Sequence, residues 1–93
     1  MTPLNMSQRF APSPDALESR VGDETVLLHL GNSAYYGLDP VGTRIWELIK
    51  AGHDLAGVKA QMLAEYAVDD AVMTADMQRF VGDLLANGIL CES

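Results

Sequence analysis

The chain has 93 residues, enough for one small domain, and thirteen carboxylates against six Lys and Arg give it a formal charge of −7. The six bases are spread along the chain, so it lacks the clustered positive charge that binding to nucleic acids or anionic membranes requires. No apolar run approaches the roughly 20 residues of a membrane span, the N-terminus lacks the apolar core of a secretory signal, and the single Cys91 excludes an internal disulfide.

The first fifteen residues contain three of the four prolines and show little periodicity. This composition predicts a flexible N-terminal arm, residues 1–15, pinned by Phe10, followed by a folded domain over residues 16–93. Within that domain, alternating side chains predict strands at 16–21 and 33–38, and a run of β-branched and apolar residues predicts one at 25–30. Gly22-Asp23 is the first expected turn. Gly31-Asn32 favours a tight turn with positive φ, which would join the second and third strands in a hairpin.

Three helices are expected to follow. Asp39 and Pro40 are the preferred residues for the cap and the first position of a helix over 40–51, which Gly52 would end in a left-handed conformation. Asp54 can cap a second helix that runs to about residue 66. Either Asp69 or Asp70 can cap a third helix that runs to about residue 87, where Gly88 would end it. Strands followed by helices predict an α+β fold with a small three-stranded antiparallel sheet.

The sequence contains no convincing set of catalytic or metal-binding residues. His29 in a strand and His53 in a turn lack further ligands nearby, and Cys91 lies three residues from the end of the chain. The adjacent Asp69 and Asp70 are explained by helix capping. Glycine-rich phosphate loops are absent from the sequence, since its glycines occupy scattered turn and cap positions. The sequence therefore predicts no enzyme activity, no metal site and no cofactor, and its lone cysteine and missing signal predict a cytoplasmic location.

Two features leave more than one interpretation open. Tyr35 and Tyr36 lie in a short strand at a possible sheet edge, where Tyr36 would be core and Tyr35 surface, or where an extended peptide could add as a further strand. Met73, Met77 and Phe80 form a soft stripe on the third helix, which is more often core but would also suit a peptide groove.

These motifs, taken in order, resemble the PqqD-like family, also called RiPP recognition elements, which are peptide chaperones of ribosomal peptide-modification pathways. The resemblance runs from about residue 21 to residue 90. It rests on the following residues: Tyr36-Gly37-Leu38-Asp39, Ile45-Trp46, Gly52, Glu65-Tyr66 and Asp76-Met77 with Phe80. Asp39 stands where the family usually has Asn, an exchange between two good helix caps.

The resemblance implies a winged-helix-like domain that binds the leader segment of a precursor peptide. The leader would be held as an added strand on the third predicted strand, with its apolar side chains entering the space between that strand and the third helix. Backbone pairing is assigned to Ser33, Ala34, Tyr35, Tyr36 and Gly37. Met73, Met77 and Phe80 would form the pocket wall, while Asp76, Arg79 and Asp83 would set the charge preference for the leader.

Further partners follow from the same resemblance. A radical S-adenosylmethionine enzyme and a leader protease with a cyclase are both compatible as the enzyme that receives the leader. The alternative function is a winged-helix DNA-binding regulator, which the acidic third helix opposes. A third possibility is a toxin-antitoxin or assembly protein that dimerises through the sheet edge. The expected oligomeric state is a monomer or a weak edge-strand homodimer.

Overall fold

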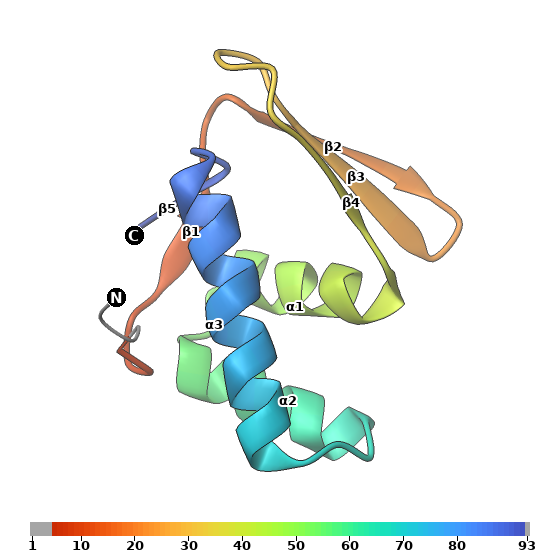
Figure 1. The fold of residues 1–93 in the computed structure, drawn as a ribbon, viewed down its shortest axis with the longest axis vertical. Coiled ribbons are helices and arrows are strands. Elements are labelled where there is room, and N and C mark those ends of the chain that lie inside the picture. Colours follow the sequence, from red (N-terminus) through yellow and green to blue (C-terminus); the bar gives the residue numbers. More distant parts are fainter. Residues whose placement is uncertain (1–4, 93) are drawn as a thin grey trace.

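A computed structural model describes residues 5–92 of the chain (Figure 1). Its elements in chain order are β1 (Phe10–Pro12), β2 (Ala16–Val21), β3 (Glu24–His29), β4 (Tyr35–Leu38), α1 (Pro40–Lys50), α2 (Leu55–Glu65), α3 (Asp70–Ala86) and β5 (Leu90–Glu92). Strands β2, β3 and β4 form an antiparallel sheet in that order, while β1 pairs with β5 in a separate two-stranded sheet. The predicted α+β fold is confirmed, including its three-stranded sheet and three helices.

The three-stranded sheet has one face toward the helices and one face toward solvent. Thr25 and Leu27 of β3 are fully buried, and they pair with Leu38 and Tyr36 of β4. The alternate residues face outward, so that Tyr35 is 68% exposed. The predicted alternation of Tyr36 and Leu38 against Tyr35 and Gly37 is therefore confirmed. The strand order β2-β3-β4 leaves β4 at a free edge of the sheet.

The loop between β3 and β4 differs from the predicted tight turn. β4 begins at Tyr35 rather than at Ser33, and the positive φ belongs to Ser33 (59°), not to Gly31 or Asn32. Side chains explain the wider loop. The Nδ1 atom of His29 accepts hydrogen bonds from the amides of Gly31 and Asn32, and the Asn32 side chain accepts one from the amide of Ala34. These bonds replace the ladder of a two-residue hairpin.

The helix boundaries follow from their caps. Asp39, Asp54 and Asp69 each accept a hydrogen bond from a backbone amide in the first turn of α1, α2 and α3. Gly52 (φ 98°) and Gly88 (φ 74°) adopt the left-handed conformation after α1 and α3, as predicted. Local side-chain chemistry thus determines where each of the three helices starts.

The second sheet was not anticipated from the sequence. Strands β1 and β5 join residues near the two ends of the chain, with Phe10 opposite Glu92 and Pro12 opposite Leu90. Figure 1 shows this pair on the opposite side of α3 from the three-stranded sheet. The division of the chain into an arm and a domain at residue 15 stays a prediction, although residues 10–12 of that arm form a strand.

The same N-terminal segment also completes the start of α2. The carbonyls of Met6 and Gln8 accept hydrogen bonds from the amides of Ala56 and Leu55, which have no acceptor within the helix. Phe10 is 3% exposed and joins the hydrophobic core. Residues 6–12 are therefore packed against the helical part of the fold.

Candidate functional site

The free edge of β4 presents two residues with backbone groups that no neighbouring strand uses. The amide of His29 donates to the carbonyl of Ala34 (2.9 Å), so this is a hydrogen-bonded pair of the β3–β4 ladder. Because such pairs alternate in an antiparallel ladder, Tyr36 and Leu38 also face β3. The N–H and C=O groups of Tyr35 and Gly37 consequently point away from the sheet. An extended peptide could bond to them as a fourth strand.

A small hydrophobic pocket lies on the inner side of this edge. Its volume is about 290 Å³, and its lining comprises Tyr36, Gly37, Leu38, Asp39, Gly42 and Phe80. Phe80 comes from α3, Gly42 from the first turn of α1, and the others from β4 and its junction with α1. The pocket therefore lies where β4, α1 and α3 meet, next to the unpaired backbone groups.

Gly42, in the first turn of α1, lies where α1 approaches Phe80 of α3 and the end of β4. A Cβ placed on Gly42 would lie 3.2 Å from Oδ1 of Asp39, which caps α1, and 3.5 Å from Cε1 of Phe80 and from Cβ of Leu38. Even Ala would therefore fill part of the space in which the Phe80 ring borders the pocket. Glycine inside a helical turn costs about 0.5–1 kcal/mol relative to alanine, and here it leaves room beside the strand.

The far end of β4 is tied to the end of α3. The Asn87 side chain donates to the hydroxyl of Tyr36 (3.1 Å), and the Asn32 side chain donates to the carbonyl of Asn87 (3.0 Å). These bonds set the spacing between β4 and the C-terminal end of α3. The pocket beside Phe80 thus lies between these hydrogen bonds at one end and Gly42 at the other.

The predicted pocket walls Met73 and Met77 lie elsewhere. They are 3% and 1% exposed, and both belong to the hydrophobic core. Of the three predicted wall residues, Phe80 alone borders the pocket. A role for the two methionines in contacting a peptide stays a prediction, because in this structure their side chains are buried in the hydrophobic core.

The predicted polar residues lie on the surface of α3. Arg79 forms an ion pair with Asp76 (3.0 Å). The Arg79 side chain is 72% exposed and the Asp76 side chain 49% exposed. Asp83 is also exposed. Ser33 and Ala34 lie in the loop before β4, and the Ala34 carbonyl is already bonded to β3. Among the eleven predicted site residues, the structure brings together Tyr35, Tyr36, Gly37 and Phe80.

Three lining residues were missed: Leu38, Asp39 and Gly42. From the sequence alone, Leu38 and Asp39 are assigned to a strand end, a helix cap and the family motif, and to no binding site. A glycine within the first turn of a helix was the available signal for Gly42, since it often marks a close approach of another element.

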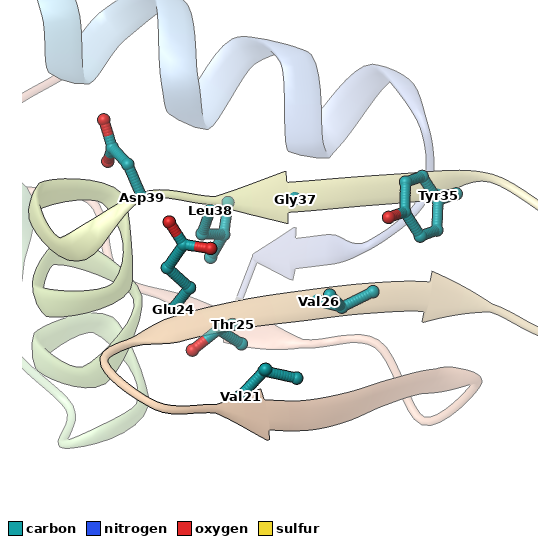
Figure 2. A pocket seen from close by; sticks show the side chains of 8 residues that line it. All are labelled: Val21, Glu24, Thr25, Val26, Tyr35, Gly37, Leu38 and Asp39. Carbon is teal, nitrogen blue, oxygen red and sulfur yellow. The ribbon is translucent and has the colours of Figure 1, made fainter.

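A second hollow, of about 440 Å³, lies on the outer face of the sheet. Figure 2 shows Tyr35 at one end of it and Glu24 and Asp39 at the other, with Gly37 and Val26 between them. The free edge of β4 therefore has a hollow on each face, and Gly37, Leu38 and Asp39 border both.

Two glutamates, Glu65 of α2 and Glu18 of β2, are hydrogen-bonded to side chains of neighbouring elements. Hydrogen bonds from Arg44 and Gln61 lower the pKa of Glu65 to about 2. Partial burial alone would raise the pKa of Glu18, but hydrogen bonds from Lys50 and the Trp46 indole outweigh it and hold that pKa below its ordinary value. These bonds join the sheet and α2 to α1 and leave the pocket beside Phe80 uncharged except for Asp39.

Within residues 5–92 there is no cluster of three or more His, Cys, Asp or Glu side chains that could hold a metal ion. In the same part of the chain, none of the helices combines the length and the apolar character that crossing a membrane demands.

Comparison with known proteins agrees with this architecture. The family model described as "Coenzyme PQQ synthesis protein D (PqqD)" matches residues 24–90. The chain belongs to the PqqD family. No curated protein sequence matches it.

Two solved structures resemble the chain. One, "TbiB1 in Complex with the TbiA(beta) Leader Peptide", is 35% identical, covers 86% of this chain and 93% of its own, and superposes with a TM-score of 0.81. The other, "Lasso peptide synthetase B1 complexed with the leader peptide", is 24% identical, covers 89% of this chain and 98% of its own, and has the same TM-score. The second supports the fold, while the first also shares substantial sequence.

Proposed function

We propose that this protein binds the leader segment of a ribosomally made precursor peptide as an added strand on β4. The observation that carries the proposal is the free edge at Tyr35 and Gly37, placed directly beside the pocket that Phe80 borders. Backbone bonds to the edge would provide affinity for any extended segment. The pocket would select an apolar leader side chain on the inner face.

Family membership and a relative described in complex with a leader peptide support the same function. The protein would be a non-catalytic chaperone that needs no cofactor. It would present the leader to a modifying enzyme, either a radical S-adenosylmethionine enzyme or a leader protease with a cyclase. We place it in the cytoplasm, where ribosomal precursors are made. The free β4 edge would leave it a monomer or a weak edge-paired dimer.

DNA binding finds no support. The exposed surface of α3 carries Asp76 and Asp83 against Arg79, and acidic side chains would repel the phosphates of a DNA groove. The two solved structures that resemble the chain are described in complex with leader peptides, and neither with a nucleic acid.

A titration of the isotopically labelled protein with the leader of the precursor peptide encoded nearest to its gene tests the proposal. We expect changes in amide chemical shift centred on Tyr35 and Gly37 and on residues near Phe80. The dissociation constant should be on the order of micromolar, because an unfolded leader loses entropy on docking. The amides of Tyr35 and Gly37 should also become protected from hydrogen exchange. Equal shifts with a scrambled leader, or none with the authentic one, would contradict the proposal.

A further inference from the structure

The outer face of the sheet carries exposed apolar side chains around a gap. Tyr35 and Val21 are 68% and 64% exposed, and Val26 lies between them on the central strand. Gly37, which pairs with Val26, contributes no side chain, and a Cβ added to it would meet nothing within 4 Å. The hollow of about 440 Å³ is the space that a side chain at position 37 would otherwise partly occupy.

One end of this hollow is acidic. Glu24 precedes Thr25, whose partner is Leu38, so Glu24 and Asp39 come to the same end of the β3–β4 pair. Figure 2 shows both carboxylates at that end, opposite Tyr35. Among the ion pairs formed within residues 5–92, none involves Glu24 or Asp39. Asp39 uses one oxygen to cap α1, through the amide of Gly42.

A peptide strand added to β4 would place side chains on both faces of the sheet. Successive residues of a strand alternate, so a residue that enters the inner pocket beside Phe80 has neighbours that point to the outer face. One of these neighbours would lie opposite Gly37. Its diagonal neighbours would be Tyr35 of β4 and Asp39, the residue that follows the strand, at about 7–8 Å, which is within reach of a long side chain.

The chemistry of the hollow matches a basic side chain. Val26 and Val21 offer an apolar floor for an aliphatic stem, while Glu24 and Asp39 attract a cationic end group. The Tyr35 ring borders the other side, where it can stack with a guanidinium group. The net charge of −7 attracts cations to the protein as a whole. Glu24 and Asp39 concentrate this electrostatic attraction at one end of the hollow.

We infer that the outer hollow at Gly37 is a specificity subsite for a Lys or Arg of the leader, adjacent in sequence to the apolar residue that enters the Phe80 pocket. This inference rests on the proposed function. It adds that the protein reads two consecutive leader side chains, one on each face of the β4 edge.

The test measures binding to a set of leader peptides, in which each position of the leader encoded nearest to the gene is replaced in turn by Lys and by Glu. The wild-type protein is compared with the double variant Glu24→Gln/Asp39→Asn. Both replacements are close in shape, and Asn caps a helix as well as Asp does, so α1 is retained. The matched control, Asp70→Asn/Glu92→Gln, removes the same charge from two exposed positions away from the hollow.

We expect one position, next to the apolar anchor, at which wild type prefers Lys over Glu more strongly than elsewhere. Glu24→Gln/Asp39→Asn should reduce that preference by about two- to five-fold, the range of exposed ion pairs, and the control variant should not. If the leader binds but the double variant lowers the preference for Lys equally at every position, or at none, the inference is overturned and the proposed function stays intact. A leader that does not bind wild type at all would overturn both.

Discussion

The orientation of the β4 backbone makes a sharp prediction about proline. The N–H of Gly37 points away from β3, whereas the N–H of Tyr36 points toward it. Gly37→Pro therefore removes a group that the folded protein does not use, and proline is tolerated on edge strands in this orientation. Tyr36→Pro removes a bond of the β3–β4 ladder and should weaken the fold itself.

The size of the effect on leader binding follows from one hydrogen bond. Loss of a typical bond costs about 0.5–1.5 kcal/mol, and the cost is about 1–3 kcal/mol where the leader carbonyl stays buried without a donor. The proline ring would also occupy the place of the incoming strand. Since 1.4 kcal/mol corresponds to a factor of ten, we expect the Kd of Gly37→Pro to rise by at least about ten-fold.

Isothermal titration with the leader peptide measures this change, and thermal unfolding checks that each variant is folded. Gly37→Ala is the matched control, because it keeps the N–H and adds a methyl group that meets nothing within 4 Å. Its affinity should fall much less than that of Gly37→Pro, because the N–H bond is kept and the methyl group occupies only part of the outer hollow. A folded Gly37→Pro variant with unchanged affinity would refute the assignment of the β4 edge as the binding site.

Three further predictions concern the fold that holds the site. Thr43→Val should cost about 1–3 kcal/mol of unfolding free energy, because the fully buried Thr25 hydroxyl loses its donor at 3.2 Å; adding Thr25→Val should recover part of this loss in urea unfolding. Met77→Ala should cost about 2–5 kcal/mol, as expected for a core side chain that is 1% exposed, and a loss below about 1 kcal/mol in the same assay would argue against its burial. The pKa of Glu65 is lowered from 4.5 to about 2, so its ionised form stabilises the fold above pH 4.5 and this stabilisation is lost as the pH falls toward 2. Arg44→Ala should remove that part of the pH dependence of unfolding, and an unchanged profile would show that the ion pair contributes nothing in solution.

The burial of Met77 also limits how the site can be tested. A charge introduced there would lie in the core, so Met77→Glu would lower stability whether or not the residue contacts a leader. Substitutions at Gly37 and at Glu24 avoid this difficulty, because both positions are exposed.

The sequence by itself determined the local architecture. Asp39, Asp54 and Asp69 define three helix starts because a cap bonds to amides within three residues of itself. Gly52 and Gly88 end helices because only glycine adopts their φ angles without steric cost. The alternation along β4 likewise fixed which side chains share a face, and the ordered motifs indicated the family.

Only the tertiary structure decided the site. Whether Met73 and Met77 line a pocket or fill the core depends on how closely α3 packs, which helical periodicity does not specify. The β1–β5 pair joins strands of three residues that lie some 80 positions apart, too short to show a period and too distant for a turn signal. The two hollows beside β4 exist because Gly42 and Gly37 leave space between elements brought together by packing, and space of that kind is a property of the assembled fold.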